Sequence, residues 1–184
     1  MHYLQDIMAD FAGFCEDRLA MDAVGARGED IAPLQNALEI NLIASFRELV
    51  RWRWQWDIDN PHAAFEKSVH TSASFSIDSE GPLFNSLLYF TSLEQATELV
   101  LYNTTLLMFV HFYQDITKES IAGPGLSIWP EHMRPSPTNP LILPSESQTM
   151  DEIALETCRS VDYHLQGTHA SSGSFSLMFP LRMW

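Results

Sequence analysis

The stretch Leu93-Glu-Gln-Ala-Thr-Glu-Leu-Val-Leu-Tyr-Asn-Thr-Thr-Leu-Leu-Met-Phe-Val-His-Phe-Tyr-Gln-Asp-Ile116 decides the fold of this chain. Two overlapping capping boxes open it, Thr91 with Glu94 and Ser92 with Gln95, and such boxes mark a helix start. Apolar side chains cover most of the helix circumference, which is typical of a helix in the centre of a protein or in a membrane. Its most apolar part is shorter than the roughly 20 apolar residues that a membrane span requires. The stretch therefore predicts a central core helix.

Length, charge and cysteine content limit the class of protein. A chain of 184 residues supports one domain with its own hydrophobic core, so we expect a single domain over 1–184. Cys15 and Cys158 are far apart and form no C-x-x-C, which indicates neither a disulfide framework nor a zinc site and suits a reducing compartment. The N-terminus carries no basic region followed by an apolar run, so no signal peptide is expected. These features predict an intracellular protein without a membrane span, a bound metal or another cofactor.

The acidic balance of the chain argues against direct contact with nucleic acid. It has 10 basic and 24 acidic residues, a formal net charge of −14. Nucleic-acid binding requires clustered Lys and Arg that release counterions from the phosphates, and an acidic surface repels those phosphates. We therefore expect no direct nucleic-acid binding by this chain.

Three further helices are predicted around the central one. Apolar residues at helical spacing indicate a helix over about 2–23, and a second helix follows Pro33 and ends at Asn60-Pro61. A last helix begins near Ser147 or Thr149, where Thr149 and Glu152 form a capping box, and it stops at Gly167. We expect its buried stripe to consist of Ala154, Leu155, Cys158, Val161 and Leu165.

The segments between these helices give weaker signals. A short helix is expected around 63–69, an extended loop over 72–78, and an apolar lead-in to the central helix over 84–90. The six prolines from Pro124 to Pro144 predict a long irregular loop. The apolar residues 175–184 resemble the start of another helix. The fold class predicted is all-α, an irregular helical domain with a central buried helix and a long Pro-rich loop.

Two short motifs near the C-terminus carry a resemblance to a known family. The segment Ala154-Leu-Glu-Thr-Cys-Arg-Ser-Val-Asp-Tyr163, followed by Leu177-Met-Phe-Pro-Leu-Arg182, resembles the C-terminal part of the fungal-specific regulatory domain of zinc binuclear-cluster transcription factors. The tract Leu49-Val-Arg-Trp-Arg-Trp-Gln-Trp56 also resembles that family's basic–tryptophan segment, and the helix from Leu93 resembles its central helix. The resemblance runs from about Ala32 to the C-terminus. The positions matching its motifs are Cys158, Arg159, Tyr163, Pro180 and Arg182.

The chain also departs from that family. It lacks the six cysteines and the basic stretch of the zinc cluster, so we expect a truncated or detached regulatory domain. The resemblance implies a nuclear location, although no Lys/Arg cluster forms a nuclear address and a cytoplasmic location stays open. It further implies transcription regulation through a protein partner or a homo-oligomer. A link to secondary metabolism is the other use that we expect for such a domain.

Five side chains are candidates for binding an apolar small molecule: Trp52, Trp56, Met108, His111 and Phe112. The tryptophans, four apart on one helical face, would serve either as a packed core-edge cluster with neighbouring arginines or as a ligand or partner surface. Met108, His111 and Phe112 lie in the central helix. We expect His111 to be a structural histidine in apolar surroundings, and a cavity beside it would make it a general base.

Other tempting groups have structural explanations. Arg159 and Tyr163 are four apart, and Arg159 is expected to pair with a carboxylate or a helix end rather than to take part in catalysis. Asp162 and His164 point to different helix faces and His169 lies beyond Gly167, so no metal site is predicted. No nucleophile elbow, P-loop or metal-ligand helix is present, and the catalytic residues of any reaction stay unknown.

Two functions from different classes are consistent with these observations. The first is a transcription-factor-like regulatory protein that acts by protein association or effector binding. The second is a secondary-metabolite biosynthesis protein that binds an apolar molecule and assists its isomerisation or cyclisation. An apolar cavity lined by the five candidate side chains would favour the second, and a solid core with an exposed apolar patch would favour the first. A third alternative is a fragment without an independent role.

Overall fold

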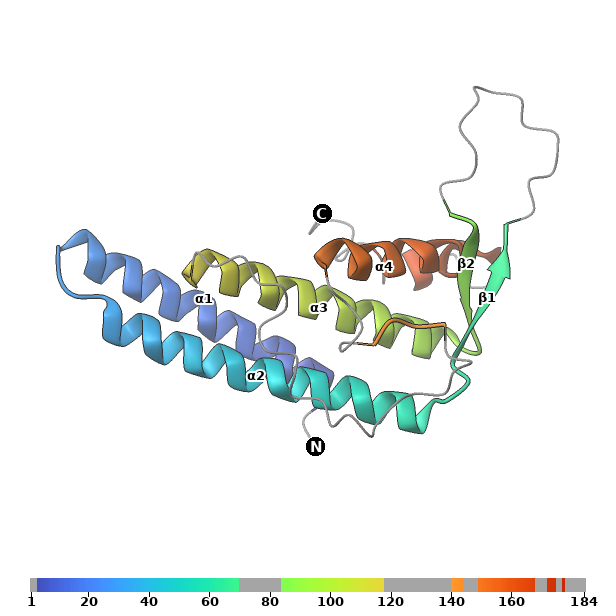
Figure 1. Ribbon diagram of the computed structural model, residues 1–184, viewed down its shortest axis with the longest axis horizontal. Coiled ribbons are helices and arrows are strands. Elements are labelled where there is room, and N and C mark those ends of the chain that lie inside the picture. The colour runs from blue at the N-terminus through green and yellow to red at the C-terminus, as the bar shows by residue number, and fades with distance from the viewer. Residues whose placement is uncertain are drawn as a thin grey trace, which may run out of the picture.

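Three long helices and one shorter helix dominate the computed structural model, which describes residues 3–69, 84–117, 140–143, 149–167, 172–174 and 177 (Figure 1). The elements in chain order are α1 (Leu4–Ala26), α2 (Ala32–Asp59), β1 (Ala64–Ser68), β2 (Ser86–Phe90), α3 (Leu93–Thr117) and α4 (Met150–Leu165). Helices α1 and α2 form an antiparallel pair, and α3 lies between that pair and α4. The fold is all-α apart from the small two-stranded sheet.

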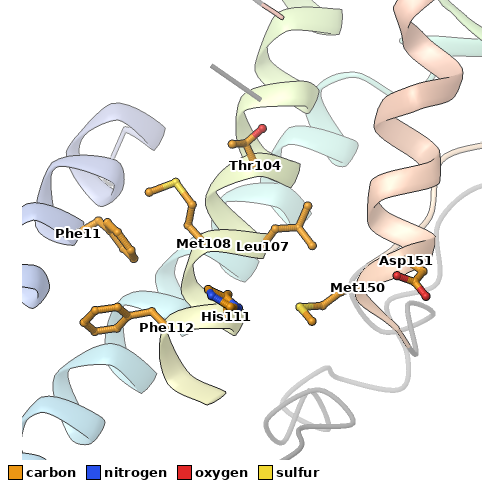
Figure 2. A pocket seen from close by; sticks show the side chains of 8 residues that line it. All are labelled: Phe11, Thr104, Leu107, Met108, His111, Phe112, Met150 and Asp151. Atoms are coloured by element: carbon orange, nitrogen blue, oxygen red, sulfur yellow. The ribbon is translucent and has the colours of Figure 1, made fainter. Parts of the chain in front are cut away.

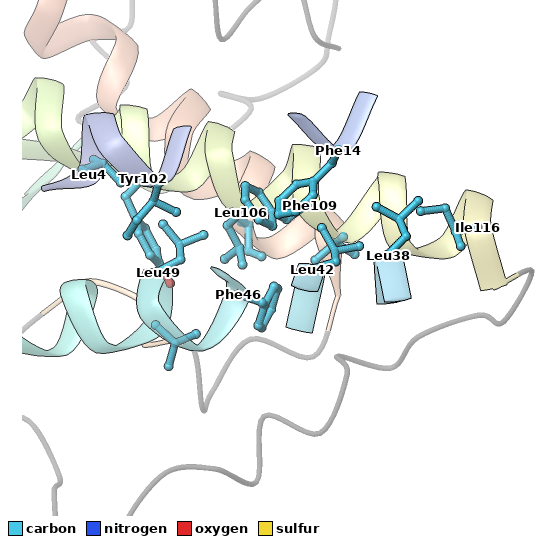
Figure 3. Close-up of a cluster of buried hydrophobic side chains, with 14 residues drawn as sticks. Leu4, Phe14, Leu38, Leu42, Phe46, Leu49, Tyr102, Leu106, Phe109 and Ile116 are labelled. Atoms are coloured by element: carbon cyan, nitrogen blue, oxygen red, sulfur yellow. The ribbon is translucent and has the colours of Figure 1, made fainter. Parts of the chain in front are cut away.

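Helix α3 is the central core helix that its sequence predicts. Its start is capped by Ser92, whose Oγ accepts a hydrogen bond from the Gln95 N–H at 3.2 Å. Leu106 and Phe109 pack into the main core with side chains of α1 and α2 (Figure 3), and Leu99 enters a second apolar cluster beside the sheet. The labelled members of the main core in Figure 3 are Leu4, Phe14, Leu38, Leu42, Phe46, Leu49, Tyr102, Leu106, Phe109 and Ile116. Because α3 serves both clusters, its apolar circumference is explained by burial within the protein.

The loop between α1 and α2 depends on one glycine. Helix α1 extends to Ala26, beyond the predicted end at about residue 23. Gly28 then adopts φ 75°, a left-handed conformation that side chains with a Cβ rarely take. Asp30 follows, and its carboxylate accepts the Ala32 N–H at 3.0 Å at the start of α2. The turn reverses the chain so that the apolar faces of the two helices meet.

The β-hairpin corrects two predictions from the sequence. Residues 63–69 are not a short helix and residues 84–90 are not merely a lead-in, because β1 and β2 pair antiparallel with Ala64 opposite Phe90. In β2 the side chains of Leu88, Tyr89 and Phe90 are buried, whereas in β1 the residues after Ala64 are exposed. The short, largely polar β1 pairs with a strand far along the chain, so its own sequence gives little indication of a strand. The expected loops over 72–78 and across Pro124–Pro137 lie outside the described residues.

Helix α4 has the predicted start but presents a different face to the core. Thr149 caps it as expected, accepting the Glu152 N–H at 3.3 Å while Glu152 accepts the Thr149 N–H at 3.1 Å. The predicted buried stripe is wrong, since Leu155 is 48% exposed and Leu165 is 50% exposed. The buried residues are instead Ile153, Glu156, Thr157, Ser160, Tyr163 and His164. The mostly polar face of α4 is therefore the inward one.

The end of the described chain packs closely on α4. Residues 172–174 and Leu177 are helical, and the Leu177 side chain is buried. A Cβ at Gly173 would lie 2.0 Å from the carbonyl oxygen of His164, so a glycine is required there. The rest of the helix expected over 175–184 lies outside the described residues. Within the described part of the chain, no helix is long and apolar enough to cross a membrane.

The central position of α3 predicts a large effect of truncating Phe109. Phe109 is 0% exposed and its ring lies 5.6 Å from that of Phe11 and 5.8 Å from that of Phe14. Phe109→Ala should lower the free energy of unfolding by about 3–5 kcal/mol, because the side chain leaves a cavity between three helices. Leu19→Ala, at a position that is 69% exposed, should stay within about 0.5 kcal/mol. Urea denaturation measures both, and equal losses would contradict this packing.

Candidate functional site

A cleft on α3 is the candidate functional site. It has a volume of about 280 Å³ and lies where α1, α3 and the first turn of α4 meet (Figure 2). Its lining residues are Phe11, Thr104, Leu107, Met108, His111, Phe112, Met150 and Asp151. Phe11 and Phe112 lie on the α1 side, and Met150 and Asp151 lie on the α4 side, with the α3 surface between them. The volume is just under the range of about 300–1,000 Å³ typical of small-molecule sites.

Few polar groups of the cleft are available to a ligand. The Thr104 hydroxyl donates to the Val100 carbonyl at 2.7 Å within α3, so its proton is already engaged. His111 and Asp151 are the other polar side chains among the described lining residues, and both are exposed. The cleft is thus an apolar hollow with an imidazole on α3 and a carboxylate on α4. Such a site would select an apolar molecule and orient it through a small number of hydrogen bonds.

Only three of the five candidate ligand-binding residues meet at this cleft. Met108, His111 and Phe112 line it, whereas Trp52 and Trp56 lie in a different hollow. The expectation that His111 is enclosed by apolar side chains is wrong, because it occupies an exposed position on α3. Its sequence neighbour Val110 is buried in the main core instead, because successive residues of a helix are about 100° apart.

Local sequence patterns do not reveal the residues that α1 and α4 contribute to the cleft. Phe11 fits the apolar stripe of the first helix, and Met150 and Asp151 fit the start of the last helix. Each is brought to α3 by the packing of whole helices that are far apart along the chain. That juxtaposition exists only in the folded arrangement.

Trp52 and Trp56 line a second hollow, at the other end of α3. It has a volume of about 630 Å³, and its other lining residues are Tyr3, Asp59, Asn60, Ser92, Glu94, Gln95 and Glu98. The Trp56 Nε1–H donates to Glu98 at 2.7 Å, and the carboxylates of Asp59 and Glu94 lie on the same lining. This hollow is polar and acidic, so the two tryptophans do not join Met108, His111 and Phe112 in one apolar cavity.

The tryptophans belong to a stacked cluster around a buried arginine. The Trp52 ring stacks on Trp56 at 6.4 Å between centroids and on Tyr102 at 5.8 Å. The Arg53 guanidinium carbon lies 5.1 Å from the Trp56 ring centre and 5.6 Å from that of Tyr102. Arg53 is 0% exposed and forms an ion pair with Asp57, one helical turn later. The aromatic faces and the carboxylate together compensate a guanidinium that has lost its water.

A buried polar layer joins α3 to α4. The Glu156 carboxylate accepts hydrogen bonds from the Ile142 N–H at 2.7 Å and from the Asn103 side chain at 3.0 Å. Asn103 also donates to Thr157 at 3.3 Å. Burial raises the pKa of the Glu156 carboxyl above its usual value, while the charge of Arg53 and these N–H donors oppose the rise. This layer explains why the polar face of α4 is turned inward.

The positions that match the family motifs form structural contacts where they are described. Arg159 extends to the hairpin, where its guanidinium pairs with Glu66 of β1 and donates to the Ser86 carbonyl and hydroxyl at 3.2 and 2.9 Å. Tyr163 is buried against Tyr89 and Phe90, and Cys158 is half-buried with a free thiol. Pro180 and Arg182 lie outside the described residues.

The acidic and histidine side chains near the end of α4 do not assemble into a metal site. Asp162 accepts hydrogen bonds from the Tyr89 hydroxyl and the Gln166 amide, and His164 is buried with its Nδ1 at 3.0 Å from the Ser160 carbonyl oxygen. His169 lies outside the described residues. Within the described ranges, no group of three or more His, Cys, Asp or Glu side chains is placed to hold a metal ion.

Comparison with known proteins identifies no relative of this chain. The chain matches no protein-family model, no curated protein and no solved structure. The residues of the cleft and their geometry are therefore the main basis for assigning a function.

Glu156 gives a prediction about pH. Because its pKa is raised in the folded state, folding is favoured below the unfolded-state pKa and loses stability as pH rises through the folded-state pKa. Glu156→Gln removes this titration, so the melting temperature of the variant relative to the parent chain should rise as the pH is increased above about 4.3, the ordinary pKa of a glutamate carboxyl. Calorimetry at a series of pH values measures the difference. The control is Glu16→Gln, an exposed change on α1, and its melting temperature relative to the parent chain should not change with pH in this way. A difference for Glu156→Gln that stays constant with pH would contradict a raised pKa of Glu156.

The buried Arg53–Asp57 pair gives a prediction about stability. Asp57→Ala should cost about 3–5 kcal/mol, because it leaves a buried guanidinium without its carboxylate. The double variant Arg53→Met/Asp57→Ala should be more stable than Asp57→Ala alone, since the uncompensated charge is gone. The exposed pair of Arg51 and Glu48 is the matched control, and Glu48→Ala should cost at most about 1 kcal/mol. Additive losses in the double variant, measured by urea denaturation, would show that the pair is not coupled.

Proposed function

We propose that this protein is a regulatory domain that binds an apolar effector in the α3 cleft and acts through a protein partner, not through direct contact with DNA. The observation that carries the proposal is the cleft, where apolar walls come from three helices and the exposed polar side chains among the described lining residues are His111 and Asp151. A site of this composition suits binding and selection of a ligand. The resemblance of the α4 region to a fungal regulatory domain supports the same class.

The position of the cleft offers a route from ligand to partner. A bound ligand would contact Met150 and Asp151 in the first turn of α4 together with Phe11 of α1, so it would favour one placement of α4 against the other helices. The same helix turns Leu155 and Leu165 toward solvent, each about half exposed. We propose these two side chains as part of the surface that meets the partner. Ligand binding and partner binding would then be coupled through α4.

Charge supports the exclusion of direct DNA contact. The chain has a formal net charge of −14, and the hollow beside Trp52 and Trp56 carries Asp59, Glu94 and Glu98. Arg53, which a basic–tryptophan segment could offer to phosphates, is buried and paired with Asp57. Arg51 and Arg47 remain near the surface of α2, too few for the counterion release on which such binding depends.

A second candidate function is supported by one feature of the same cleft. His111 and Asp151 both line it, and an imidazole beside an apolar hollow can take a proton from a bound molecule and return it at another carbon. The reaction class would be isomerisation or cyclisation of an apolar metabolite. It needs no metal or other cofactor, since proton transfer alone accomplishes the shift.

The test is a thermal-shift and light-scattering experiment with the neutral apolar probe N-phenyl-1-naphthylamine. Binding in the cleft should stabilise the protein by about 2.7 kcal/mol at a probe concentration about 100 times the dissociation constant. Leu107→Trp, which fills the cleft, should abolish the shift, and Leu34→Trp, on a 42% exposed position of α2, should retain it. Light scattering then reports whether the probe changes the association state of the chain.

The outcomes separate the candidates. A probe-dependent change in association supports the regulatory function. Probe binding with no such change, together with conversion of 3-cyclohexenone to 2-cyclohexenone that His111→Ala abolishes, supports the enzymatic alternative. Equal shifts in the Leu107→Trp and Leu34→Trp variants would show that the cleft is not the binding site.

A further inference from the structure

The two polar side chains of the α3 cleft define what a ligand must offer them. Asp151 is in the first turn of α4, after the Thr149 cap, and its carboxylate can only accept hydrogen bonds. His111 is on α3 and can donate or accept through its ring nitrogens. Thr104 donates its proton to Val100, so its hydroxyl offers the ligand no donor. The lining thus has a fixed acceptor on one side and an adaptable group on the other.

The apolar lining indicates the shape of the ligand. The Phe11 and Phe112 rings meet edge to face with centroids 5.3 Å apart, and they form one wall. Met108 and Met150 bring thioethers from α3 and α4 (Figure 2). Thioethers contact aromatic rings favourably and adapt to irregular shapes. Phenyl rings and thioethers around a hollow of about 280 Å³ suit a flat unsaturated molecule of one or two rings.

We infer that the effector of this cleft is a flat apolar molecule that carries a hydroxyl group, with the hydroxyl donating to Asp151. This inference rests on the proposed binding function and names the ligand class of that site. A carboxylate in the same place would lie beside the Asp151 carboxylate and be repelled. An ether or a bare hydrocarbon has no O–H to donate, so it would leave the Asp151 carboxylate without a bond from the ligand.

The experiment compares four naphthalene probes of nearly equal size by equilibrium dialysis. They are 2-naphthol, 2-methoxynaphthalene, 2-naphthoate and naphthalene. We expect 2-naphthol to bind at least about fivefold more tightly than 2-methoxynaphthalene, the factor that one net hydrogen bond provides. The naphthoate should bind most weakly, and naphthalene measures the apolar contribution alone.

Variants of Asp151 test the role of its carboxylate. Asp151→Ala should lose about fivefold in affinity for 2-naphthol and nothing for naphthalene, because only the hydroxyl loses its acceptor. Asp151→Asn retains an acceptor oxygen and should keep the preference for naphthol over its methyl ether. Asp17→Ala removes the same charge from an exposed position on α1 outside the cleft, and it should change neither affinity. Circular dichroism and the melting temperature verify that each variant is folded.

Each remaining outcome has one meaning. Equal binding of all four probes, unaffected by Asp151→Ala, would overturn the hydroxyl preference while the apolar binding function stands. Tightest binding of 2-naphthoate would also overturn it, since the site would then recognise an anion. If no probe binds, the cleft is not a ligand site, and both the inference and the effector-binding proposal fail.

Discussion

The structure depends on the hydrogen bonds that Glu156 makes inside the interface between α3 and α4. A buried carboxylate without hydrogen-bond partners would be strongly unfavourable. The Asn103 amide and the Ile142 N–H provide these partners, so α4 must be oriented with Glu156 facing them. That requirement turns the polar side of α4 inward and leaves Leu155 and Leu165 in solvent. The outward position of these two leucines, and with it the suggested partner surface, is a consequence of this one buried layer. Hydrophobic burial alone would have selected the opposite face.

The same placement of α4 creates the cleft. The polar side of α4 is held against the middle of α3. The first turn of α4 therefore lies beside the C-terminal half of α3, where Leu107 and His111 face it. Phe11 encloses the hollow from α1 because its ring packs on Phe109 and Phe112. The site therefore has rigid support from helix packing on one side. On the other side it is bounded by the first turn of α4, a helix that the Glu156 hydrogen bonds and the buried Ile153 side chain hold in place.

How much of this could be predicted from sequence varies with the range of the interaction. Helix α3 and the Thr149 cap are predicted correctly because capping boxes and apolar coverage are local signals. The predicted buried face of α4 is wrong, since hydrophobicity favours burial of Leu155 over Glu156, whereas Asn103 and the Ile142 N–H supply the hydrogen bonds that allow Glu156 to be buried. The hairpin escapes prediction because β1 and β2 recognise each other across a long separation. For the cleft, the α3 residues are available from sequence, and the contributions of Phe11 and Met150 require the tertiary arrangement.

Arg159 has a consequence for how this fold tolerates change. Its guanidinium binds Glu66 of β1 and Ser86 of β2 at once, so the two strands are joined to α4 near the end of the hairpin where Ser68 pairs with Ser86. Their register therefore depends on α4 rather than on the segment that connects Ser68 to Ser86. A change in the number of residues between Ser68 and Ser86 would therefore leave the attachment of both strands to α4 in place. Related chains could thus differ greatly in length there and still share this domain.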